Sequence, residues 1–218
     1  MAVVDDPPTE PAGTGRDRSA SERRRGVVAA GHRGELGPVE AAHGDPDPSV
    51  RAARLGALER LGALSMAELV KAFADEDPGV RRRAAVLAVR GGGAGSRSTL
   101  PAQLIGLIAD PDPLVAEAAA WALGERRTAA SVPALSAMAT DHPDPRCREA
   151  AVAALGAIGD VRGLAAVLAG LADRPPVRRR AVVALAGFDA PEVETALEGC
   201  LGDSDWQVRQ AAEILLGR

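Results

Sequence analysis

Apolar and small residues recur through most of the chain at the three- and four-residue spacing of a single helix face. In the last such stretch these positions are Val208, Ala211, Ala212, Leu215 and Leu216, a pattern that predicts a buried helical stripe. Shorter stretches keep the same spacing and predict a second set of helices over 66–74, 100–109, 132–140, 161–172 and 191–201. The chain is therefore predicted to be all-α.

The helices of the first set begin with one shared pattern: an acidic residue, in most units a proline after it, and then a valine that is mostly followed by arginine. The valines stand at positions 50, 80, 115, 177 and 208, and Cys147 takes this place in the fourth unit. The spacings are 30, 35, 32, 30 and 31 residues. Aspartate caps free helical N–H groups, and proline suits a first helical turn. So regular a period predicts stacked helical hairpins, because one hairpin cannot bury both of its faces alone.

Glycines near the ends of these helices are predicted to cap their C-termini. They are Gly62, Gly91, Gly124, Gly156, Gly187 and Gly217. The longest spacing contains the glycine-rich segment 91–98, which we expect to be a flexible loop between units two and three.

The N-terminal stretch divides into two parts. Residues 1–18 are rich in proline, glycine, threonine and charge, and are predicted to be a disordered leader. Ser19 and Glu22 then fit a capping box at a helix start. Residues 19–31 are interpreted as half a unit that caps the stack, and 35–43 as the first helix of unit one. A single repeat domain is thus predicted over 19–218.

Composition limits the function classes. Of the 218 residues, 46% are hydrophobic but only 2% aromatic, which suits thin layers of closely packed helices. Acidic residues outnumber basic ones by 30 to 26, so the net charge of −4 gives no whole-protein attraction to nucleic acid. The sequence shows no secretory signal and no apolar run of membrane-spanning length, which predicts a cytoplasmic location. Cys147 and Cys200 fall at apolar helix positions and are expected to be buried free thiols.

The Asp-Pro-Asp-Pro-x-Val-Arg pattern of residues 45–51 resembles bacterial HEAT repeats of the PBS-lyase (phycobilisome lyase) type, and the resemblance covers residues 45–218. It implies a right-handed α-solenoid, an armadillo-like superhelix of about six hairpins plus an N-terminal half-repeat. It also implies a structural ladder, in which the arginine after each valine pairs with acidic turn residues of its own or an adjacent unit. The ladder residues are Arg51, Arg81, Arg148, Arg178 and Arg209.

The chain departs from this pattern in the middle of the array. Ala116 replaces arginine in unit three, and His142 and Pro143 are inserted ahead of the acidic residue of unit four. Unit five is shorter before Val177. We expect any particular function to be encoded at such irregular positions.

Catalytic motifs are not found in the sequence. HEAT-type hydroxylases bind iron through His-Glu pairs, whereas His32, His43 and His142 here precede no glutamate, so no metal site is expected. The glycine run at 91–95 lacks the Gly-Lys-Ser/Thr ending of a phosphate-binding loop. No catalytic residue and no cofactor is predicted, which favours an adaptor over an enzyme.

Solenoids of this kind usually bind other molecules. In the family that the chain resembles, the second helix of each unit, which here is the helix that carries the repeated valine, lines the concave face. We therefore expect a protein-binding adaptor or scaffold whose partner is a protein or peptide. The expected contact residues are Arg82, Glu117, Trp121, Glu149, Arg179 and Gln210. The alternative is a lyase- or isomerase-like helper that acts on a prosthetic group or modified peptide, which rests on the resemblance alone. Nucleic-acid binding is less favoured.

Overall fold

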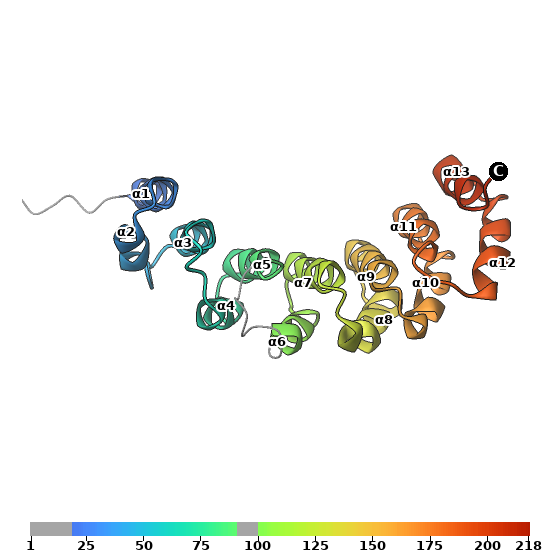
Figure 1. Cartoon of the computed structure of the whole chain (residues 1–218), viewed down its shortest axis with the longest axis horizontal. Helices are drawn as coiled ribbons and strands as arrows, with labels where there is room; N and C mark the ends of the chain where they lie inside the picture. The colour runs from blue at the N-terminus through green and yellow to red at the C-terminus, as the bar shows by residue number, and fades with distance from the viewer. Residues whose placement is uncertain (1–18, 91–99) are drawn as a thin grey trace, which may run out of the picture.

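The computed structural model describes residues 19–90 and 100–218, so the predicted leader and the predicted 91–98 loop lie outside the described residues. Within the described part, thirteen α-helices alternate between two layers and form one curved row (Figure 1). The odd-numbered helices lie on the concave side of the row, and the even-numbered helices lie on its convex side.

The two layers together give the predicted fold. The concave layer consists of α1 (Ala20–Arg33), α3 (Pro48–Arg60), α5 (Pro78–Leu87), α7 (Pro113–Glu125), α9 (Pro145–Ile158), α11 (Pro175–Leu185) and α13 (Trp206–Leu215). The convex layer consists of α2 (Leu36–Ala41), α4 (Met66–Phe73), α6 (Leu100–Leu107), α8 (Val132–Asp141), α10 (Leu164–Gly170) and α12 (Pro191–Cys200). Helix α1 is the half-repeat, and the hairpins α2–α3 to α12–α13 are the six units. The prediction of an all-α solenoid is therefore confirmed.

Most concave helices start as the Asp-Pro sequences predict. A backbone N–H in the first turn donates to the aspartate that precedes each of five helices: Asp47, Asp77, Asp112, Asp144 and Asp205. Ser19 and Glu22 form the predicted capping box at α1. One convex helix starts differently from the prediction, because the segment expected to be helical over 161–172 opens with a 3₁₀ turn, Val161–Gly163, before α10 begins.

The residue that defines each unit lies at the centre of the core. The five valines and Cys147 are each at most 2% exposed, and burying one such side chain stabilises the fold by roughly 1.5–3 kcal/mol. Cys147 and Cys200 are buried and free, as predicted. Burial raises the pKa of the Cys147 thiol to about 11, so this thiol stays protonated and inert at neutral pH. Within 19–90 and 100–218, no helix combines the length and hydropathy that crossing a membrane requires.

Two of the glycines predicted to cap helices instead lie where neighbouring concave helices pack closely together. Gly124 lies inside α7, and a Cβ built on it would lie 2.8 Å from Cα of Ala154 in α9. Gly156 lies inside α9, and its Cβ would lie 2.6 Å from Cβ of Ala184 in α11. Because glycine has no Cβ, the helix backbones approach closely at these two points. The left-handed residue that ends α9 is Gly159, not Gly156.

Arginine–aspartate pairs connect successive hairpins along the edge at which the concave helices begin. In each pair the arginine Nε and Nη2 donate to both carboxylate oxygens at 2.6–2.9 Å, and we call each pair a rung. The rungs are Arg23–Asp45, Arg51–Asp75, Arg81–Asp110, Arg148–Asp173 and Arg178–Asp203. The guanidinium of Arg148 holds the pKa of Asp173 below its usual value, against the opposing effect of burial.

The predicted ladder arginines also brace their own turns. Nη1 of Arg51, Arg81, Arg148, Arg178 and Arg209 donates to a carbonyl oxygen five or six residues earlier. Arg209 belongs to the last unit, and in the described part of the chain it makes only such carbonyl contacts. Four of the predicted arginines thus join two units, and the fifth braces one.

One rung is missing, and both of its halves are replaced together. Ala116 stands where the other units have arginine, and His142 stands five residues before Cys147, where most other units carry the paired aspartate. In other units this aspartate also accepts a hydrogen bond from the backbone N–H two residues later. The His142 ring keeps that contact, because its Nδ1 accepts a hydrogen bond from the Asp144 backbone N–H at 3.1 Å. We therefore interpret Ala116 and His142 as one paired replacement. Because both residues differ together, no partly buried arginine or carboxylate is left without its partner at this junction.

Restoring this rung gives a test of that interpretation. Ala116→Arg combined with His142→Asp is expected to show a favourable coupling of about 1–2 kcal/mol in a double-mutant cycle of unfolding free energies, since the two residues interact directly. Ala116→Arg alone is expected to destabilise, because the added guanidinium lacks a carboxylate. Urea denaturation of the four proteins measures the coupling. Strictly additive effects would show that Ala116 and His142 are unrelated positions.

Candidate functional site

The concave layer encloses a cavity of about 610 Å³ that is lined by residues of α5, α7, α9 and α11. Its floor is made of small side chains: Ala118, Ala150, Ala153, Ala154 and Ala157. The floor follows from the packing of the layer, because small residues are needed where neighbouring concave helices approach closely. The same requirement leaves open space above the helix junctions.

Trp121 is the one large aromatic side chain among the described residues that line this cavity. It lies on α7, six positions after the buried Val115, and 44% of it is exposed. An exposed indole next to a floor of alanines offers a flat apolar surface and one N–H donor.

Charged side chains of both signs surround the tryptophan. They are Arg82 on α5, Glu117 and Glu125 on α7, Arg146 and Glu149 on α9, and Arg180 on α11. Nη2 of Arg180 lies 3.3 Å from Oε1 of Glu149, and Arg146 pairs with Asp144 at 2.7 Å. Such pairs, with one or both side chains partly exposed, contribute little to stability.

The structure brings together four of the six predicted contact residues. Arg82, Glu117, Trp121 and Glu149 all line this one cavity. Arg179 instead donates from Nε to the Asp205 carboxylate at 2.7 Å, which ties it to the start of α13. Gln210 is exposed on α13, which lies beyond α11 in the row (Figure 1).

Three of the charged residues around the cavity are absent from the predicted set. Arg146 precedes Cys147, Glu125 is the last residue of α7, and Arg180 stands three positions after Val177. The run of three arginines at 178–180 was the available signal for Arg180. Arg179 and Arg180 stand two and three positions after the buried Val177, and the repeat pattern alone does not distinguish which of them lines the cavity.

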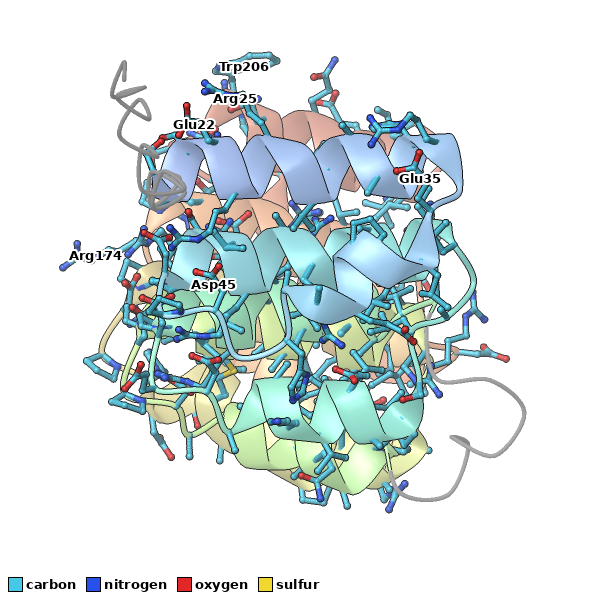
Figure 2. All side chains as sticks on the ribbon, turned by 90° about the vertical axis from the view of Figure 1, so that its left-hand side faces the viewer. Glu22, Arg25, Glu35, Asp45, Arg174 and Trp206 are labelled. Atoms are coloured by element: carbon cyan, nitrogen blue, oxygen red, sulfur yellow. The ribbon has the colours of Figure 1, made fainter. Side chains whose placement is uncertain are left out.

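A second tryptophan, Trp206, also lies on a concave helix. Trp206 is the first residue of α13, and 61% of it is exposed. Figure 2, which looks along the row, shows Trp206 projecting beyond the same side of the molecule as Arg25 of α1. The apolar pattern of this helix begins at Val208, two residues after the helix itself does.

The three histidines lie apart from this cavity. Nε2 of His43 lies 2.6 Å from Nζ of Lys71, and His142 accepts from the turn of unit four. His32 lies on α1. The described residues contain no group of three or more His, Cys, Asp or Glu side chains placed to hold a metal ion.

Comparison with known proteins places this architecture. Residues 100–183 match the family described as HEAT repeats. Among curated proteins there is no match. Solved structures with the same fold include YibA from Escherichia coli, with a TM-score of 0.66 and 17% identity, covering 92% of this chain and 76% of YibA.

Two further structures are similar over nearly the whole chain. A designed armadillo repeat protein in complex with the peptide (KR)4 has a TM-score of 0.58 and 18% identity, covering 92% of this chain and 99% of the design. The complex of CpcE and CpcF of phycocyanin lyase from Nostoc has a TM-score of 0.56 and 22% identity, covering 97% of this chain and 79% of that chain. At these identities the likeness concerns the fold. The repeated hairpins and the match over 100–183 make this chain similar to HEAT repeat proteins.

Proposed function

We propose that this solenoid is a non-catalytic adaptor that binds a protein or peptide on its concave face, with Trp121 as the central contact. The observation that carries the proposal is the cavity around Trp121, where a 44% exposed indole lies beside an alanine floor. Tryptophan and arginine are the side chains that most often dominate binding energy at interfaces. The cavity has both, since Arg82, Arg146 and Arg180 line it.

The likeness to the designed armadillo repeat protein supports a peptide partner, because that protein has this fold and is in complex with a peptide. The likeness to the CpcE–CpcF complex supports a protein partner and is compatible with the lyase-like alternative. No side chain around Trp121 favours that alternative over simple binding.

The proposal is tested by selecting a random peptide library on the full chain and measuring the affinity of a fluorescein-labelled winner by anisotropy. Trp121→Ala is expected to weaken binding about 30-fold, the effect of losing a hot spot worth about 2 kcal/mol. Arg179, although it is one of the predicted contact residues, is not substituted in this test, because its replacement would also remove its ion pair with Asp205.

Trp206→Ala is the matched control, since it removes the other exposed tryptophan at a place outside the cavity. This control is expected to bind the peptide as tightly as the wild type does. Unchanged binding by Trp121→Ala, or a library that yields no specific peptide, would contradict the proposed face.

A further inference from the structure

The N-terminal end of the concave face carries a second, more open groove with a volume of about 870 Å³. It runs along α1 and α3, and its floor is apolar and small: Val28, Ala29, Ala52, Ala53 and Gly56. Val28 is 39% exposed. The floor therefore offers contact for aliphatic side chains but lacks the depth and the rings that would hold a large aromatic group.

The rim of this groove is basic. It carries Arg24, Arg25, Arg33, Arg60 and Arg83, together with His32. The described residues that line the groove include no aspartate or glutamate. Two acidic side chains flank α1, as Figure 2 shows, and both are engaged: Glu22 with Ser19 and Glu35 with Arg33. Positive charge is thus concentrated here although the whole chain has a net charge of −4.

Two of these arginines reach the groove from the following helices. A Cβ built on Gly56 of α3 would lie 2.5 Å from Nη2 of Arg83, so the Arg83 side chain extends from α5 back over α3. A Cβ built on Gly31 of α1 would lie 3.3 Å from Nη1 of Arg60, so Arg60 extends from α3 back over α1. Charges from three helices are therefore brought to one groove.

In the described part of the chain, four of the five rim arginines have no ion-pair partner, and the fifth, Arg33, pairs with Glu35. Arg24, Arg25, Arg60 and Arg83 form no ion pair with another described residue, in contrast to the rung arginines. Repulsion among four guanidinium groups along one groove slightly lowers the stability of the free protein. An anionic partner that binds there offsets this repulsion. The cluster thus has the character of a binding surface.

We propose that this groove binds an acidic peptide segment of a partner protein whose aliphatic side chains contact the α1–α3 floor. Guanidinium groups pair with carboxylates in a planar, two-bond geometry. A nucleic-acid strand fits the groove less well, because the described residues that line it include no Phe, Tyr or Trp side chain to stack against bases. This inference rests on the proposed function and adds the direction in which the segment is bound. The acidic part of the bound segment lies over α1–α5, and its apolar anchor lies at Trp121.

The test uses the full chain and a fluorescein-labelled peptide of repeating Glu-Leu-Glu units, with a Lys-Leu-Lys peptide and a thymidine oligonucleotide as comparisons. Arg25→Glu combined with Arg60→Glu is expected to weaken binding of the acidic peptide at least about tenfold, since attraction becomes repulsion. Binding by the wild type is expected to weaken as salt is added. Arg24→Glu combined with Arg83→Glu provides a second variant with the same expectation.

The control is Arg127→Glu combined with Arg174→Glu, which changes the net charge equally at exposed positions outside the groove. Arg174 projects from a different edge of the molecule (Figure 2). Unchanged melting curves verify that each variant is folded. Wild-type affinity in both groove variants, or tighter binding of the oligonucleotide than of the acidic peptide, would overturn this inference. If Trp121→Ala still loses its selected peptide in that case, the proposed function stands and only the acidic groove is wrong.

Discussion

Replacing Gly156 with alanine is expected to lower the free energy of unfolding by about 2 kcal/mol, the usual cost of overpacking a tight contact. The new Cβ would meet Cβ of Ala184 at 2.6 Å and its Cα at 2.7 Å. The Cα cannot rotate away as a long side chain would, so α9 and α11 must move apart. Urea denaturation followed by far-UV circular dichroism measures the loss.

Gly26→Ala is the matched control for this substitution. Gly26 lies inside α1, and nothing lies within 4 Å of a Cβ built on it. The change is therefore expected to stabilise the protein by about 0.5–1 kcal/mol through helix propensity alone. Opposite signs at the two glycines would establish that Gly156 is a packing residue. Stabilisation by Gly156→Ala would show that the close approach of α9 and α11 is not required.

Replacing Arg81 with alanine is expected to cost about 2–3 kcal/mol, somewhat less than the loss of one partner from a fully buried ion pair. Arg81 donates to both oxygens of Asp110 at 2.7 and 2.9 Å, and the Asp110 side chain is only 5% exposed. The variant leaves that carboxylate with one N–H donor, from Asp112. It also removes the Arg81 hydrogen bonds to the turn of its own unit.

The effect of pH separates this cause from a loss of packing. Burial alone would raise the pKa of Asp110, but the hydrogen bonds from Arg81 and Asp112 lower it below its ordinary value. The rung therefore stabilises the fold above the unfolded-state pKa of about 3.9 and loses this contribution as the pH falls through the lower folded value. The difference between wild type and Arg81→Ala should accordingly shrink in acid.

Arg33→Ala serves as the exposed counterpart of this variant. Arg33 and Glu35 pair at 2.8 Å with side chains that are 58% and 44% exposed. Removing such a pair is expected to change stability by less than about 0.5 kcal/mol. Equal effects at Arg33 and Arg81 would contradict a special role for the rungs.

Sequence reasoning succeeds here where the signal is local. Aspartate, proline and a buried valine act within one helical turn, so their period predicts where most of the concave helices begin. The ends of the helices depend on neighbours. Gly124 and Gly156 have the spacing of caps, yet their place inside α7 and α9 is decided by how closely the next helix approaches.

Side-chain direction limits the prediction of the site in the same way. Arg179 and Arg180 are equivalent in a repeat pattern, but Arg179 pairs with Asp205 while Arg180 faces Glu149 and the cavity. The backward reach of Arg60 and Arg83 depends on glycines in the preceding helix. These contacts join residues 26 to 31 positions apart in the chain, and a period alone does not specify them.

The paired replacement at Ala116 and His142 has a consequence for how this array can be rearranged. Most units carry the same arginine and aspartate partners and look interchangeable, but units three and four fit only each other at this position. Moving unit four behind unit two would place Arg81 opposite His142, and deleting unit four would leave Ala116 opposite Asp173. The adjacency of units three and four is thus specified by their side chains as well as by the chain, so a rearrangement that separates them would have to change both units at once.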